Sequence, residues 1–252
     1  MSRDGETTLT KKANTIALSD VPSRSGVHVM FDRISPRYDL LNHLLSLGLD
    51  YSWRRRAVSK LGVGSNQTVL DLACGTGDLL LAARKRIDDG NRLIGLDKAP
   101  QMLSRAAMKI AHRNVASTKL ILGDGMALPL ADGTVDATMI AFGIRNMPDT
   151  VGCLQEMCRI LKPGGKAIVL EFSLPHNRVL RALHRFYLRT FVPFLGRVVS
   201  GDVHAYRYLD RTIETFAQGK EFCRLMQMAG FTEVEAEALS FGIVTIYTGW
   251  RP

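Results

Sequence analysis

The middle of the chain alternates between two patterns of hydrophobic and polar positions. Short runs rich in valine, isoleucine and leucine are typical of buried strands, and longer stretches with apolar residues at helical spacing are typical of amphipathic helices. We expect strands at the start of 68–78 and over 92–97, 119–124, 135–142 and 166–172, and helices over 100–111 and 150–161. Strands that alternate with helices in this way predict an open, parallel α/β sheet with right-handed crossovers.

Different patterns lie on either side of this region. The segments 233–239 and 243–248 alternate apolar and polar residues around a glycine and predict an antiparallel C-terminal hairpin. Three segments before the first strand, 27–33, 37–46 and 52–60, are expected to be helical. Helices in this position are well placed to cover a ligand site on the sheet.

The predicted organisation is one α/β domain with two additions. The domain covers 63–252, and it follows a helical cap over 26–62 and a polar tail over 1–25 that we expect to be disordered.

An insertion over 176–212 is predicted to be a basic amphipathic lid. On a helical wheel one face is apolar and the other basic: Leu180, Leu183, Tyr187 and Phe191 lie opposite Arg178, Arg181, Arg185 and Arg189. Such a helix is typical of a lid or of an element at a membrane surface. Packing of its apolar face on the sheet is the alternative.

The stretch 68–78 contains the clearest binding motif. Gly75 and Gly77 leave the turn without Cβ atoms, so a ligand can contact backbone N–H groups at the start of the next helix. A dinucleotide fingerprint would require a small residue where Leu80 stands. Asp71 and Asp78 would also repel a pyrophosphate, whereas they suit a ligand that carries an ammonium and a sulfonium group.

A further acid supports the same kind of ligand. Asp97 ends the second expected strand, about twenty residues after Gly77, where a carboxylate can accept hydrogen bonds from both ribose hydroxyls. The glycine turn, its flanking acids and this ribose acid together indicate S-adenosylmethionine (SAM) rather than NAD. A strand–turn–helix unit without any ligand is the alternative.

Charged side chains gather where the expected strands end. Ligands of open parallel sheets bind beyond the carboxyl ends of the strands. Five charged residues are predicted at these ends: Asp71, Asp97, Asp124, Arg145 and Glu171. Their convergence predicts the position of the site.

Charge and cysteine content narrow the class of protein. With 33 Lys and Arg against 24 Asp and Glu in 252 residues, the net charge is +9, which favours an anionic partner, either nucleic acid or a membrane surface. No Asn/Asp-Pro-Pro-Tyr-type stretch follows the fourth strand, so nucleic acid is not expected. The 4 cysteines have neither Cys-x-x-Cys nor metal-ligand spacing, which favours a reducing cytosol and no metal. No apolar run approaches the roughly 18–20 residues of a membrane span, so we expect a cytoplasmic protein that is at most peripheral to a membrane.

Four stretches resemble one known family. The stretch 38–46, with Trp53 beyond it, resembles the family pattern Tyr-Asp-x-Met-Asn…Ser…His-x-x-Trp; 142–146 resembles Phe-Gly-Leu-Arg-Asn; 159–173 resembles its second signature; and 206–209 adds Tyr-Arg-Tyr-Leu. From about Phe31 to the C-terminus, the chain thereby resembles the ubiquinone/menaquinone biosynthesis C-methyltransferases, which include demethylmenaquinone methyltransferases. The resemblance implies a class I SAM-dependent methyltransferase fold, Rossmann-like, with a seven-stranded, mostly parallel sheet that ends in an antiparallel hairpin.

The resemblance also implies a cofactor and its contacts. The cofactor would be SAM, the product S-adenosylhomocysteine, and no metal would take part. Thr76, Asp97 and the pair Asp124 and Gly125 match family contacts to SAM, and Ala141 stands where a serine contact is common. With the turn and strand-end residues, the expected cofactor-binding set is Asp71, Cys74, Gly75, Thr76, Gly77, Asp97, Lys98, Asp124, Gly125 and Ala141.

The implied reaction is C-methylation of a demethylated polyprenyl quinol in menaquinone or ubiquinone biosynthesis. The ring carbon becomes nucleophilic when a hydroxyl loses its proton, so the site requires a base and a group that stabilises the phenolate. We expect Arg145 and Asn146 to hold the phenolic oxygen or a water, and Asp124 to orient that water or accept the proton. Arg145 as a structural partner of a strand-end carboxylate is the alternative. The expected substrate-binding residues are Tyr38, Asn42, Phe142, Tyr206 and Tyr208.

Some positions depart from the family pattern. Leu41 and Asp50 in the cap replace a methionine and a histidine, and Arg211 in the insertion and Ala217 just after it replace a glutamate and a proline. Another phenolic or lipid substrate therefore stays open, as does a non-catalytic SAM-binding subunit. Because the tail of a polyprenyl quinol is held in a bilayer, we expect contact with the inner face of a membrane. A homodimer or a biosynthetic complex is compatible with the sequence.

Overall fold

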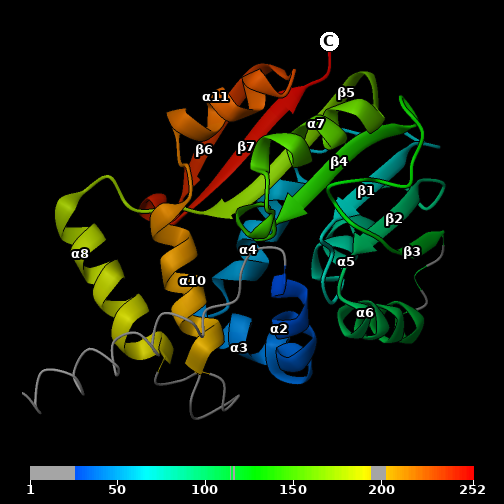
Figure 1. Cartoon of the computed structure of the whole chain (residues 1–252). Helices are drawn as coiled ribbons and strands as arrows, with labels where there is room; N and C mark the ends of the chain where they lie inside the picture. Colours follow the sequence, from blue (N-terminus) through cyan, green and yellow to red (C-terminus); the bar gives the residue numbers. More distant parts are fainter. Residues whose placement is uncertain (1–25, 114, 116, 194–202) are drawn as a thin grey trace, which may run out of the picture.

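The computed structural model describes residues 26–113, 115, 117–193 and 203–252, without the side chains of 203–207. One sheet contains seven strands in the order β3-β2-β1-β4-β5-β7-β6. The first five strands are parallel, and β7 runs antiparallel to both β5 and β6 (Figure 1). The predicted mostly parallel sheet with its C-terminal hairpin is confirmed. The predicted disordered tail over 1–25 and the part 194–202 of the predicted lid lie outside the described residues.

The bounds of the elements follow the predicted pattern closely. The strands are β1 (Thr68–Leu72), β2 (Arg92–Asp97), β3 (Thr118–Leu122), β4 (Val135–Ala141), β5 (Leu161–Phe172), β6 (Thr232–Leu239) and β7 (Val244–Trp250). The helices are α2 (Val27–Ile34), α3 (Tyr38–Leu45), α4 (Leu49–Val58), α5 (Asp78–Arg84), α6 (Pro100–His112), α7 (Thr150–Ile160), α8 (Arg178–Phe186), α10 (Val203–Thr215) and α11 (Lys220–Met228). Short helical turns are η2 (Ser35–Arg37), η3 (Ile144–Asn146), η4 (Tyr187–Phe191) and η5 (Ser240–Gly242).

The central strands are apolar on both sides because helices cover both faces of the sheet. Successive side chains of a strand point to opposite faces. Leu70 of β1 belongs to the same buried cluster as Met157 of α7, whereas the adjacent Val69 belongs to a cluster with Leu80 of α5. A continuous apolar run such as 68–72 is therefore what a two-sided core requires.

The cap and the insertion pack on each other beyond the sheet. A third buried cluster combines Met30 of α2 and Leu41 of α3 with Leu188 of η4 and Ile213 of α10. Figure 1 shows α2, α3 and α10 grouped beyond the ends of the strands. These helices therefore enclose the edge of the sheet at which the sequence predicted the site.

Two predictions need correction. The third strand ends at Leu122 rather than at residue 124, because the Asp124 carboxylate accepts the backbone N–H of Met126 at 3.0 Å and closes a turn there. The apolar face of α8 does not pack on the sheet: Leu183 is 60% exposed and Phe191, in the following turn, is 50% exposed. The helix packs through its other side, which carries arginines.

Candidate active site

Two cavities adjoin beyond the carboxyl ends of the central strands, and Phe31, Tyr38 and Phe142 line both of them. The first, of about 110 Å³, is the glycine-lined cavity, whose wall contains Gly75, Gly123, Gly125 and Gly143. The second, of about 120 Å³, is the apolar cavity, which the cap, η4, α10 and the ends of β4 and β5 enclose. The two cavities thus share part of their lining, so groups bound in them would lie close to each other.

The backbone is unusual where β1 and β4 end. Ala73 has φ of 52° and Phe142 has φ of 56°, and both line the glycine-lined cavity. Residues other than glycine rarely adopt a positive φ, so the surrounding structure must hold both turns in place. A Cβ atom on Gly143 would lie 2.9 Å from the Cβ of Ala73, so a glycine is required where the two turns meet.

Asp97 fixes the turn after β1. Its two carboxylate oxygens accept the N–H of Gly75 at 2.7 Å and the N–H of Ala99 at 2.8 Å. Burial nevertheless raises the pKa of this carboxyl above its ordinary value. Each oxygen can accept a further hydrogen bond, so Asp97 can still bind ribose hydroxyls, as predicted.

Asp124 lies in the glycine-lined cavity and not in the apolar cavity that contains Arg145. Lys98 Nζ lies 2.6 Å from Asp124 Oδ2. Partial burial opposes ionisation, but the hydrogen bonds from Lys98 and from the N–H of Met126 prevail and lower the pKa of Asp124. An ionised carboxylate with a low pKa is a weak proton acceptor, so this position favours a role in cofactor binding over a role as base.

Other predicted cofactor residues lie behind the cavity wall. Asp71 is buried, and neither of its oxygens has a side-chain hydrogen-bond partner among the described residues. Burial, together with the charge of Asp97, raises the pKa of Asp71 well above its ordinary value. Burial likewise raises the pKa of the Cys74 thiol, which makes this cysteine a poor nucleophile and supports its interpretation as a small residue in the turn.

Thr76 faces the helical cap. Its hydroxyl donates to Asp39 Oδ1 of α3 at 2.5 Å and accepts a hydrogen bond from Lys109 Nζ of α6 at 3.0 Å. Neither Thr76 nor the adjacent Gly77 lines either cavity. Gly77 has φ of 84° and permits the turn into α5. The two residues therefore support the turn on the side that faces away from the cavities.

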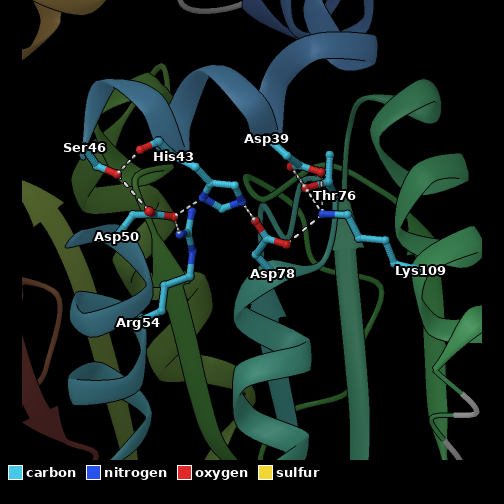
Figure 2. A network of polar contacts seen from close by, with 8 residues as sticks. All are labelled: Asp39, His43, Ser46, Asp50, Arg54, Thr76, Asp78 and Lys109. Carbon is cyan, nitrogen blue, oxygen red and sulfur yellow. Dashed lines mark hydrogen bonds and ion pairs between the residues drawn. The ribbon is translucent and has the colours of Figure 1, made fainter. Parts of the chain in front are cut away.

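The cap and the turn share a network of charges, which Figure 2 shows from close by. Lys109 Nζ lies 2.5 Å from Asp39 Oδ2 and 2.7 Å from Asp78 Oδ1. His43 Nδ1 lies 2.8 Å from Asp50 Oδ2, while its other ring nitrogen lies 3.9 Å from Asp78. These contacts attach α3 to the start of α5.

Arg145 lies in η3, the turn after β4, and lines the apolar cavity. Its Nη1 donates to Glu171 Oε1 at 2.7 Å and also to the carbonyl oxygen of Phe142, and its guanidinium lies 5.2 Å from the ring centroid of Phe172. Its Nε is buried and has no partner among the described residues. The guanidinium can therefore serve both as a structural partner of Glu171, through Nη1, and as a donor to a substrate oxygen, through Nε.

Asn146 follows Arg145 but lines the other cavity. Its amide nitrogen donates to the Phe142 carbonyl oxygen at 3.4 Å, and its Oδ1 is buried with no donor partner in the described part of the chain. The consecutive pair thus reaches both compartments. The last two residues of the motif Phe-Gly-Ile-Arg-Asn therefore line different cavities.

The predicted substrate-binding residues lie mostly in the apolar cavity. Tyr38, Asn42, Phe142 and Tyr208 contribute to its wall, whereas the side chain of Tyr206 lies outside the described residues. Burial raises the pKa of Tyr38, so its phenol stays protonated at neutral pH and can donate a hydrogen bond.

The sequence did not single out two residues of this cavity, Arg54 and His184, although His184 was one of five histidines that could act as a base. Arg54 belongs to a run of three arginines that looks like a solvated helix face, yet it is buried, is paired with Asp50, and lies 5.6 Å from the ring centroid of Phe142. The spacing of Asp50 and Arg54, four residues apart on one helix, was the available signal. His184 also lines the cavity, and its Nε2 is buried without a partner among the described residues.

The glycine-lined cavity fits SAM. A Cβ on Gly125 would lie 3.1 Å from Met147 and 3.2 Å from Leu72, so the glycine keeps the wall open. The acids Asp97 and Asp124 at this cavity favour a cationic nucleoside over a pyrophosphate. Among the described residues, no group of three or more His, Cys, Asp or Glu side chains could hold a metal ion. No helix in the described ranges is long and apolar enough to span a membrane.

Comparison with known proteins also indicates a SAM-dependent methyltransferase. The model of the ubiE/COQ5 methyltransferase family matches residues 19–251. The demethylmenaquinone methyltransferase of Thermus thermophilus is 44% identical over 223 residues, which cover 88% of this chain and 100% of that protein. The ubiquinone/menaquinone biosynthesis C-methyltransferase UbiE of Syntrophotalea carbinolica is 44% identical over 225 residues, which cover 88% of this chain and 92% of that protein.

Solved structures match the fold at lower sequence identity. A SAM-dependent methyltransferase from Aquifex aeolicus has a TM-score of 0.57 and 16% identity, over 78% of this chain and 88% of that one. The [4+2]-cyclase SpnF has a TM-score of 0.61 and 16% identity, over 92% of this chain and 98% of that one. Because a cyclase shares the fold, the fold alone does not determine the reaction.

Proposed function

The chain belongs to the ubiE/COQ5 methyltransferase family of SAM-dependent enzymes, and we propose that it methylates a ring carbon of a demethylated polyprenyl quinol. Relatives at 44% identity over nearly their whole length carry the names demethylmenaquinone methyltransferase and ubiquinone/menaquinone biosynthesis C-methyltransferase. Methylation of either quinol would give the methylated quinol, S-adenosylhomocysteine and a proton, which the methylated ring carbon loses as the ring becomes aromatic again.

The observation that carries this proposal is the placement of the two adjoining cavities. SAM, when bound, supplies an electrophilic methyl group, and the glycine-lined cavity would hold it through Gly75, Asp97 and Asp124. The apolar cavity would hold the quinol ring, with Arg145 at its polar end. The wall of Phe31, Tyr38 and Phe142 would then bring the ring carbon towards the methyl group.

Arg145 would stabilise the negative charge of the ring oxygen. Its guanidinium stays protonated and cannot act as a base, but its buried Nε, which has no partner among the described residues, can donate to a phenolate. Tyr38, which stays protonated, can donate a second hydrogen bond. These donors favour the ionised phenol, whose charge spreads onto the adjacent ring carbon.

We propose His184 as the proton acceptor. Burial lowers the pKa of His184, so its imidazole is neutral at pH 7, and its Nε2 lacks a partner in the described part of the structure. Asp50 also lines the cavity, but its bonds to Ser46 and Arg54 outweigh its burial and lower its pKa. Asp124, the acceptor expected from the sequence, would instead serve the cofactor.

The proposed substrate implies that the reaction takes place at a membrane surface. The polyprenyl tail partitions into a bilayer, so the enzyme would act in the cytoplasm at the inner face of the membrane. The apolar cavity would admit the ring, and the tail would extend out of it.

A transfer assay tests the proposal. Purified protein receives methyl-labelled SAM and chemically reduced demethylmenaquinol, or the benzoquinol precursor, in lipid vesicles. We expect label on the ring carbon of one quinol and none with the oxidised quinone, because the oxidised ring lacks the ionisable hydroxyl. Bound SAM with no transfer to either quinol would refute the quinol assignment. Another phenolic substrate, or a non-catalytic SAM-binding subunit, would then be the better hypothesis.

A further inference from the structure

The outward face of α8 is apolar although the helix carries several arginines. Val179, Leu183 and Phe186, spaced four and three residues apart, lie on one side of the helix and are 60% to 67% exposed. Phe191 in η4 is 50% exposed and lies 6.1 Å from Phe186, measured between ring centroids. We call these four residues the α8 ridge.

Ion pairs hold the ridge outward. On the opposite side of α8, Arg185 Nε lies 3.1 Å from Glu214 Oε1 of α10, and Arg189 Nη2 lies 2.6 Å from the same oxygen. Leu188 is buried on this inner side. Arg185 of α8 and Arg189 of η4 thus pair with α10, although their side chains remain 43% and 55% exposed, while the ridge residues face away from α10.

The same segment forms a wall of the apolar cavity. His184, Tyr187 and Leu188 line the cavity from within. The Tyr187 hydroxyl donates to the carbonyl oxygen of Leu45 in α3 at 2.8 Å, which attaches the segment to the cap. The cap also directs apolar side chains outward next to this attachment, namely Leu40, Leu44 and Leu47, which are 41% to 82% exposed.

Unpaired cations accompany these apolar side chains. Arg178 at the start of α8 and Arg37 before α3 are exposed, and no carboxylate of a described residue pairs with either. The chain as a whole carries a net charge of +9. Apolar side chains bordered by arginines are suited to the boundary between anionic headgroups and acyl chains.

We propose that the α8 ridge docks the protein on an anionic lipid bilayer. The ridge residues enter the acyl boundary while Arg178 and Arg37 contact anionic headgroups. Docking in this orientation places a wall of the apolar cavity against the membrane, so that a polyprenyl tail stays in lipid while its ring is bound. This part of the inference rests on the proposed function; the docking itself does not.

Vesicle flotation of the full-length protein tests the proposal. The ridge variant Val179→Ser/Leu183→Ser/Phe186→Ser is compared with wild type on vesicles of phosphatidylcholine alone and with phosphatidylglycerol added. A matched control, Met108→Ser/Leu122→Ser/Met228→Ser, removes three apolar side chains of similar exposure, 58% to 68%, from α6, β3 and α11. We expect wild type and control to float with the vesicles that contain phosphatidylglycerol. The ridge variant should bind these vesicles at least about tenfold more weakly.

The outcomes separate docking from catalysis. All three proteins also receive a short-tailed, water-soluble quinol without vesicles, and we expect equal methylation by each. Vesicle binding without any methylation would refute the proposed function and leave the docking proposal standing. Equal flotation of wild type and ridge variant would overturn the docking proposal. A wild type that is dimeric in solution, does not float, and becomes monomeric in the ridge variant would instead assign the ridge to a second copy of the chain.

Discussion

Arg145 and Glu171 form a buried ion pair, with Nη1 of the arginine 2.7 Å from Oε1 of the glutamate. The pair joins the turn after β4 to the carboxyl end of β5, and the Glu171 side chain has no exposed surface. Arg145 therefore has a fixed orientation before any ligand arrives. Such preorganisation matters in a site that must stabilise a developing charge.

Removing the glutamate charge should destabilise the fold. Glu171→Gln leaves the Arg145 charge buried without its partner, and we expect a loss of about 3–5 kcal/mol in the free energy of unfolding. Urea unfolding measures the loss. Glu237→Gln is the matched control, because Glu237 pairs with Arg56 and Lys60 at the surface and its removal should cost less than about 1 kcal/mol. Equal losses in the two variants would contradict the assigned role of the buried pair.

Replacing the arginine should affect catalysis more than cofactor binding. Arg145→Lys retains a charge but loses the planar fork that serves Glu171 and the substrate oxygen at once. We expect kcat to fall about 100-fold or more, while SAM affinity, measured by calorimetry, changes less than about threefold because Arg145 does not line the glycine-lined cavity. Full activity in this variant would restrict Arg145 to a structural role.

Local patterns predicted the sheet and the glycine turn, because strand and helix periods and turn residues are local properties of a sequence. They did not predict the burial of Arg54, which depends on how α4 is rotated against Phe142. The resemblance matched Thr76 to a cofactor contact. In the structure its hydroxyl donates to Asp39, 37 residues earlier in the chain, and no local pattern predicts that contact. The separation of Asp124 from Arg145 likewise depends on side chains from three elements that meet between the cavities.

The buried carboxyl of Asp71 should make stability depend on pH. Its pKa in the folded state is raised well above 3.8, chiefly by burial, so its contribution to stability is complete below pH 3.8 and is lost as pH rises through the folded-state pKa. Asp71→Asn should therefore increase the free energy of unfolding at pH 7. The increase should be about 1.4 kcal/mol for each pH unit by which the pKa of Asp71 is higher in the folded than in the unfolded protein.

Denaturant titrations of the two proteins over a range of pH check this expectation. The difference between Asp71→Asn and wild type should shrink on acidification and vanish below about pH 3.8, the ordinary pKa of the side chain. A variant that is less stable than wild type at pH 7 would indicate that the carboxylate is ionised and has a partner that stabilises it.

His184 should govern the acid side of the activity profile. Burial lowers its pKa below 6.5, so the fraction of neutral imidazole, and with it kcat/KM, should rise with pH through a value below 6.5. The other titratable or charged groups of the cavity are Tyr38, Asp50, Arg54, Arg145, Tyr187 and Tyr208. His184→Gln should lower kcat about 100-fold and remove the acid limb.

The exposed His176 provides a control, because His176→Gln should leave both kcat and the acid limb unchanged. SAM binding to His184→Gln, measured separately, should remain at the wild-type level, since His184 does not line the glycine-lined cavity. An acid limb that persists in His184→Gln would assign the proton to another acceptor.

The contact between Asp39 and Lys109 should hold the cap over the cofactor. Asp39 lies on α3, Lys109 on α6, and both bind the hydroxyl of Thr76 behind the cofactor turn (Figure 2). Because the two side chains are only about a quarter exposed, their interaction is screened less than a surface pair. A double-mutant cycle with Asp39→Asn and Lys109→Met should give a coupling of about 0.5–2 kcal/mol in the free energy of unfolding.

The same variants should also release SAM faster. If the network closes the cap, each single variant should raise the dissociation rate of SAM severalfold. The double variant should add little to Lys109→Met, because that change already removes the contact with Asp39. Stopped-flow displacement of SAM measures these rates, and Arg56→Met, which removes a surface pair with Glu237, serves as the control with an unchanged rate. Additive effects on the rate would mean that Asp39 and Lys109 act independently, and the cap would then be held by the contacts of His43 with Asp50 and Asp78.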